Sequence, residues 1–93
     1  MTKLEEARKN INEIDAEIAK LFEKRMMAVE EVIAYKIENN LPIFDESREK
    51  EVLKRNVEKL NNEKLRLYYE EYLQMMMDIS KKYQKAILNE KKE

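Results

Sequence analysis

Several polar side chains of this 93-residue chain stand where the spacing of apolar residues calls for hydrophobic ones. Arg25 continues an apolar series that runs from Leu4 to Leu21 in steps of three and four residues, and Lys36 follows eleven residues later. Eleven helical steps of about 100° return to within roughly 20° of the same face. Because a buried charge is costly unless it is paired or binds a ligand, the pattern indicates a ligand-binding role for both cations. Two side chains that extend to solvent are the alternative that the spacing leaves open.

A second polar pair interrupts another apolar series nearer the C-terminus. Ser80 and Gln84 lie one helical turn apart between Leu73 and Ile87, on the face that the apolar residues mark as buried. Both side chains can donate hydrogen bonds to a ligand. A buried, mutually hydrogen-bonded pair is the alternative here.

Three further polar residues follow the only proline, Pro42. Asp45 is a good N-cap residue for a helix, and capping accounts for much of its placement. Arg48 and Glu49 fall in the first turn of that helix, where free backbone N–H groups and the helix dipole favour an anion.

The chemistry that these groups suggest is electrostatic. Their excess charge is positive, although 19 Lys and Arg against 20 Asp and Glu give the whole chain a net charge of −1. This predicts a pocket for a small polyanion such as a dicarboxylate. The chain has no Cys and no His, and no nucleophile stands beside a base, so we expect no metal and no cofactor. Any catalysis would rest on positioning and electrostatic stabilisation.

Charge and hydropathy also bound the partners. A nucleic-acid binder of this size would normally be clearly basic, so we expect no nucleic-acid partner. No apolar run approaches 18 residues and the N-terminus lacks the apolar core of a signal peptide. We therefore expect a cytoplasmic chain that does not bind membranes.

An all-α fold must position these residues. The chain lacks Gly altogether and is rich in helix formers. With breaks only at Asn39-Asn40 and Pro42 and at Asn61-Asn62, the pattern predicts helices over about residues 3–39, 46–60 and 63–90, in a single domain of residues 1–93.

The first helix is too long for a compact monomer. About 36 residues at 1.5 Å each span roughly 54 Å, whereas a compact chain of this length is roughly 30 Å across. Two shorter helices cannot cover its apolar stripe. We therefore predict an intertwined homodimer built on long paired helices.

The ordered set of these residues resembles the all-helical (AroQ-type) chorismate mutases over nearly the whole chain. The matching segments are Leu4-x-x-x-Arg8-x-x-Ile11-x-x-Ile14-Asp15-x-x-Ile18, Leu21-x-x-x-Arg25, Ile33-Ala34-x-Lys36, Pro42-Ile43-x-Asp45-x-x-Arg48-Glu49-x-x-Val52-Leu53 and Ser80-x-x-x-Gln84. The resemblance implies conversion of chorismate to prephenate in phenylalanine and tyrosine biosynthesis. This reaction is an intramolecular rearrangement that forms no covalent intermediate with the enzyme and needs no cofactor.

The resemblance also implies roles for individual residues. Lys36 and Gln84 would donate to the ether oxygen of the breaking bond. Lys36 would also reach a carboxylate of chorismate, and Arg25 would bind a carboxylate. Arg48 and Asp45 would shape the pocket. Two further roles are a contact of Glu49 with the ring hydroxyl and of Ser80 with a carboxylate.

Arg8 matches the family pattern but lies 17 residues, about 25 Å of helix, from Arg25. One small ligand cannot reach both from one straight helix. We therefore infer two equivalent sites per homodimer, each with Arg8 of the partner chain.

Two other functions remain as alternatives. An isochorismate-pyruvate lyase on the same fold would share the arginines and Gln84, but the presence of both Asp45 and Glu49 favours the mutase. A non-enzymatic three-helix interaction module needs one or two buried polar residues to set its register, whereas this chain has eight in a family's order.

Overall fold

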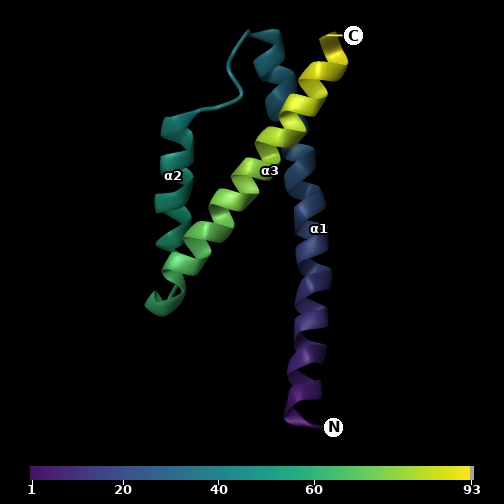
Figure 1. Ribbon diagram of the computed structural model, residues 1–93, viewed down its shortest axis with the longest axis vertical. Coiled ribbons are helices and arrows are strands. Elements are labelled where there is room, and N and C mark those ends of the chain that lie inside the picture. Colours follow the sequence, from purple (N-terminus) through teal and green to yellow (C-terminus); the bar gives the residue numbers. More distant parts are fainter. Residues whose placement is uncertain (93) are drawn as a thin grey trace.

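The computed structural model describes residues 1–92, whose regular secondary structure is entirely helical, with no β-strand. Helix α1 spans Lys3–Glu38, α2 spans Glu46–Val57, a short 3-10 helix η1 spans Glu63–Leu65 and α3 spans Arg66–Lys92 (Figure 1). The all-α prediction with three main helices is confirmed. None of the helices in this part of the chain is long and apolar enough to cross a membrane.

Helix α1 ends where the asparagine pair predicted it would. The N–H of Leu41 donates to the carbonyl of Lys36 at 2.8 Å, and the N–H of Asn40 donates to the carbonyl of Ile37 at 3.4 Å. These are the two bonds of a Schellman cap, in which Asn40 occupies the left-handed region at φ 55°. Asparagine tolerates this conformation better than most residues, which explains the break without a glycine.

The boundaries of the later helices differ from the prediction. The second helix ends at Val57 rather than at residue 60, because Lys59 and Leu60 donate their N–H groups three residues back, to Asn56 and Val57. Such bonds tighten and close a helix end. The third helix begins as the 3-10 turn η1, capped by the side chain of Asn62, and continues to Lys92 rather than residue 90.

Helix α3 is the element against which both other helices pack. It crosses the C-terminal half of α1 obliquely, and α2 lies along its other side (Figure 1). Among the described residues, the buried hydrophobic ones come from α1 and α3: Val29, Ile33, Leu73 and Met77. A core this small leaves much of the apolar surface uncovered.

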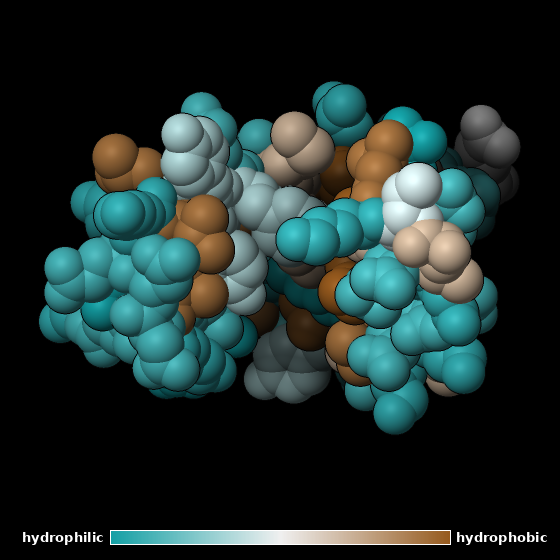
Figure 2. All heavy atoms as spheres, turned by 90° about the horizontal axis from the view of Figure 1, so that it is seen from below, coloured by the Kyte–Doolittle hydropathy of each residue, from teal (hydrophilic) through white to brown (hydrophobic). Residues whose placement is uncertain are grey.

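The N-terminal end of α1 extends beyond the other helices (Figure 1). The described chain measures 54 Å along its longest axis and has a radius of gyration of 16.8 Å, against about 12 Å for a compact domain of this length. Every residue from 1 to 24 is exposed, including five of the apolar stripe: Leu4, Ile11, Ile14, Ile18 and Leu21. Seen from below, hydrophobic side chains run through the middle of the molecule between hydrophilic flanks (Figure 2).

Candidate active site

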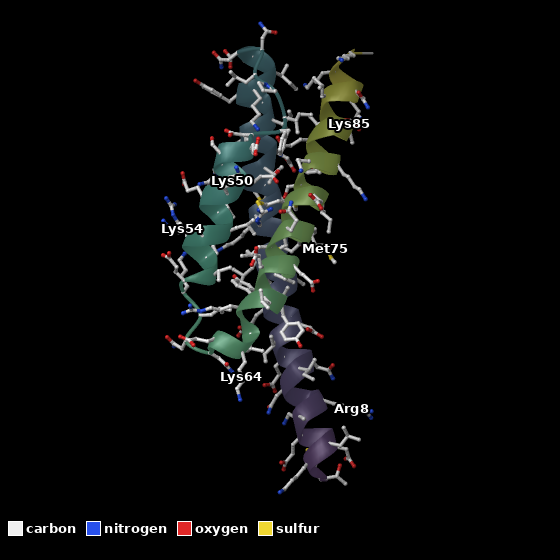
Figure 3. The ribbon with its side chains drawn as sticks, turned by 60° about the vertical axis from the view of Figure 1, so that its left-hand side comes forward. Arg8, Lys50, Lys54, Lys64, Met75 and Lys85 are labelled. Carbon is white, nitrogen blue, oxygen red and sulfur yellow. The ribbon has the colours of Figure 1, made fainter. Side chains whose placement is uncertain are left out.

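A cavity of about 270 Å³ lies between the three helices. Seven of the eight residues singled out by the sequence line it, from all three helices and the connection before α2: Arg25, Lys36, Asp45, Arg48, Glu49, Ser80 and Gln84. The eighth, Arg8, lies near the free end of α1, away from α2 and α3 (Figure 3). One chain therefore brings together all of the predicted set except Arg8.

Arg25 and Ser80 contact each other across the α1–α3 interface. The guanidinium of Arg25 donates a hydrogen bond to the hydroxyl oxygen of Ser80, and that hydroxyl donates to the carbonyl of Met76 at 2.8 Å. Arg25 is half-buried and Ser80 is buried. The guanidinium is thus held at the cavity wall, which differs from the alternative of a side chain extended to solvent.

Lys36 lies at the other end of the cavity, where α1 meets the connection to α2. Its Nζ donates to the backbone carbonyl of Ile43 at 2.7 Å, and the side chain is half-buried. The ammonium group carries three donors. It can therefore hold the connection in place and still donate to a ligand in the cavity.

Gln84 is buried, with 6% of its surface exposed, and its Oε1 has no hydrogen-bond partner among the described residues. It does not pair with Ser80, whose hydroxyl is engaged by Arg25 and Met76. The alternative of a Ser80–Gln84 pair is therefore not what the structure contains. A buried amide oxygen without a partner costs about 1–3 kcal/mol, so a ligand that forms a hydrogen bond with this amide offsets that cost.

Asp45 caps α2, as predicted. Its carboxylate accepts from the backbone N–H of Arg48 at 3.1 Å and from the hydroxyl of Ser47 at 3.0 Å. These hydrogen bonds, that from Arg48 first, lower the pKa of the Asp45 carboxyl group below its ordinary value. The guanidinium of Arg48 itself pairs with Glu51 at 2.7 Å on the exposed side of α2.

Glu49 is held by two residues of α3. Its Oε1 accepts from Nε2 of Gln74 at 3.2 Å, and its Oε2 pairs with Nζ of Lys81 at 3.0 Å. Lys81 also lines the cavity and contacts Asp78 at 3.3 Å. The hydrogen bond with Glu49, and to a lesser degree that with Asp78, raises the pKa of Lys81 above its ordinary value against the opposing effect of desolvation.

Sequence reasoning missed Lys81. It directly follows Ser80 and lies three residues after Asp78, a spacing that brings the two side chains together on a helix. That spacing could have indicated that Lys81 belongs to the site, but solvated ion pairs on a helix surface have the same spacing. Only the packing of α2 on α3 places Glu49 beside it.

The cavity carries a positive formal charge. Four cationic side chains line it, Arg25, Lys36, Arg48 and Lys81, against the carboxylates of Asp45 and Glu49, which leaves a charge of +2. No group of three Asp, Glu, His or Cys side chains that could hold a metal occurs in residues 1–92. The arrangement can bind a small dianion and place hydrogen-bond donors around it.

These features define an all-helical protein with a cationic cavity shared among three helices. The sequence profile of the family described as chorismate mutase type II matches residues 7–85, which is most of the chain. The chain therefore belongs to the chorismate mutase type II family, the all-helical class. No curated protein and no solved structure matches the chain significantly.

Proposed function

We propose that this chain is a chorismate mutase that converts chorismate to prephenate by an intramolecular Claisen rearrangement, in a single domain of residues 1–93. The observation that carries the proposal is the convergence of seven family-pattern residues on one cavity with a formal charge of +2. Chorismate carries two carboxylates, so the charges are complementary. The reaction needs no nucleophile or proton transfer, only a held conformer and stabilised charge.

Lys36 and Gln84 act on the ether oxygen, which gains negative charge as the C–O bond breaks. Both line the cavity from opposite helices, α1 and α3. The Lys36 ammonium keeps donors beyond its bond to Ile43, and the Gln84 side-chain amide makes no hydrogen bond with the described residues through Oε1. Rotation of that amide presents its NH₂ group to the oxygen. Donors aimed at developing charge stabilise the transition state more than the substrate.

The remaining residues bind the substrate. Arg25, which the Ser80 hydroxyl holds, binds one carboxylate, and Ser80 lies beside it. Glu49 accepts from the ring hydroxyl. Arg48 turns from Glu51 toward the cavity when substrate enters, since an exposed ion pair of this kind is worth only about 0–1 kcal/mol. Asp45 fixes the start of α2 and thereby the wall of the pocket.

A second copy of the chain completes the site. The exposed apolar stripe of α1 continues into an apolar hollow of about 340 Å³, which is lined by Ile18, Leu21, Phe22, Arg25, Tyr69, Tyr72, Met75, Met76 and Ile79. A monomer rarely leaves so long an apolar surface in water. An antiparallel partner α1 would cover it and carry the partner's Arg8 to the cavity of the first chain.

The mutase proposal is tested with purified protein by following the loss of chorismate absorbance and identifying the product. Prephenate as the product supports the proposal. Release of pyruvate from isochorismate, with no turnover of chorismate, would assign the chain to the lyase reaction instead. The assembly is tested separately by sedimentation equilibrium at micromolar concentration, where we expect about twice 11.3 kDa. An active monomer would contradict the shared site.

A further inference from the structure

The carboxylate of Glu49 poses an electrostatic problem for a site that binds a dianion. Its side chain is only 16% exposed and lines the cavity with the groups that attract the substrate. A carboxylate there repels both carboxylates of the substrate, and poor solvation strengthens the repulsion. The site can use Glu49 as an acceptor only if another group offsets its charge.

Lys81 is placed to do so. Its Nζ lies 3.0 Å from Oε2 of Glu49, and the side chain is 28% exposed, which makes this the least exposed ion pair among the described residues. The ammonium of Lys81 also lies 4.9 Å from the centre of the Phe44 ring, in the connection between α1 and α2. This cation–π contact helps to hold the ammonium in position. Because Gln74 engages Oε1, both oxygens of Glu49 are held from α3.

The remaining charges of the site do not replace Lys81. Without it, Arg25, Lys36 and Arg48 stand against Asp45 and Glu49, and the formal charge falls from +2 to +1. Arg48 pairs with Glu51, and Arg25 and Lys36 donate to Ser80 and Ile43. None of the three forms an ion pair with Glu49.

We propose that Lys81 is a positioning residue of this site: it holds the Glu49 carboxylate as the acceptor for the ring hydroxyl and offsets its charge toward the dianionic substrate. This inference rests on the proposed mutase activity and adds a residue to it. Lys81 acts through Glu49 and does not need to touch the substrate. Its effect is therefore expected in substrate binding more than in the chemical step.

The test is steady-state kinetics of chorismate turnover with the full chain and matched variants. Lys81→Met keeps the aliphatic stem and removes the charge, and Lys81→Gln keeps a hydrogen-bond donor. We expect Lys81→Met to raise KM by about tenfold with a smaller change in kcat, because the Glu49 carboxylate then repels the dianionic substrate with no neighbouring cation to offset its charge. Lys81→Arg restores the charge and should return KM to within about threefold of the parent. Lys82→Met is the matched control, since Lys82 is exposed and does not line the cavity.

A double variant separates this role from a structural one. If Lys81 acts through the carboxylate of Glu49, then Lys81→Met should change KM by less than about twofold in a chain that already carries Glu49→Gln. An equal rise in KM on Lys81→Met with and without Glu49→Gln would overturn the inference, because Lys81 would then act independently of Glu49. A KM for Lys81→Met equal to that of Lys82→Met would overturn it as well.

Misfolding of a variant and inactivity of the parent chain can each be told apart from a failure of the Lys81 inference. Circular dichroism and thermal melting report whether each variant folds, and Lys81→Gln tests the inference where Lys81→Met does not fold. Failure of both to fold would make Lys81 a structural residue and overturn the inference. A parent chain that does not convert chorismate overturns the proposed function, and this inference with it. An active parent with an unaffected Lys81→Met variant overturns this inference alone.

Discussion

Gln84→Glu tests the proposed chemistry most directly, because it makes one hydrogen-bond donor depend on pH. Gln84 is 6% exposed, and its Oε1 has no partner among the described residues. A carboxyl group in this position can donate only while it is protonated. Poor solvation raises its pKa above the ordinary value of about 4.3, so that the donor form persists into mildly acidic solution.

The expected magnitude follows from the loss of one donor to the ether oxygen. Such a loss typically costs about 2.7–4 kcal/mol, or roughly 10²–10³ in kcat. We expect kcat of Gln84→Glu to approach that of the parent near pH 5 and to fall by at least about 10² by pH 8. At pH 8 the ionised carboxylate cannot donate a hydrogen bond, and it repels the dianionic substrate. The parent has no His and a neutral Gln84, so it should show no comparable loss.

The stability of this variant changes in the same direction. Its folded-state pKa is raised above the unfolded value, so the neutral form folds without penalty below the unfolded pKa, and stability falls as pH rises through the folded pKa. Each unit by which the folded-state pKa exceeds the unfolded value corresponds to about 1.4 kcal/mol of stability. Urea unfolding at pH 5 and pH 8 measures the difference, and activity is compared only where the variant is folded.

Gln84→Met is the matched control, since it fills the same space and donates at no pH. Its loss of kcat should be independent of pH between 5 and 8. Near pH 5, kcat of Gln84→Met should therefore be lower than kcat of Gln84→Glu. A Gln84→Glu variant that follows the parent's pH profile at similar kcat would refute the reasoning. Gln84 would then not face the ether oxygen, and its assigned role on α3 would be wrong.

Three other substitutions test separate parts of the structure. Lys36→Met should lower kcat by roughly 10²–10³ while the chain remains folded, as measured by kinetics and circular dichroism; a change in KM alone would remove Lys36 from the chemical step. Mixing inactive Arg8→Ala and Lys36→Ala chains should restore part of the activity after subunit exchange, because one site of a heterodimer then carries neither defect; no recovery despite proven exchange would exclude Arg8 in trans. Ile33→Ala should lower the free energy of unfolding by about 2–5 kcal/mol, because Ile33 is 1% exposed at the α1–α3 contact; a loss below about 1 kcal/mol would mean that this contact adds little to stability.

The sequence predicted the elements of this protein because the signals for them are local. The absence of Gly, the single Pro42 and the Asn39-Asn40 pair determine where a helix can run and where it must stop, and Asp45 begins the next one through its own side chain. Arg25, Lys36, Ser80 and Gln84 were recognised because a polar residue on an apolar face is visible in the spacing alone. Where the signal was weaker, as between Val57 and Asn62, the predicted helix ran three residues too far.

The partners of those residues were decided only by the packing of the helices. Which lysine of α3 meets Glu49 depends on the angle and rotation at which α2 packs against α3, and no local pattern encodes these. In the sequence, Lys81 therefore could not be distinguished from the many surface lysines, although it pairs with Glu49 at 3.0 Å. The same holds for Arg48, whose guanidinium turns to Glu51, and for Gln84, whose Oε1 stays unpaired. Spacing along a helix determines which face a residue lies on, whereas tertiary packing decides what lies opposite that face.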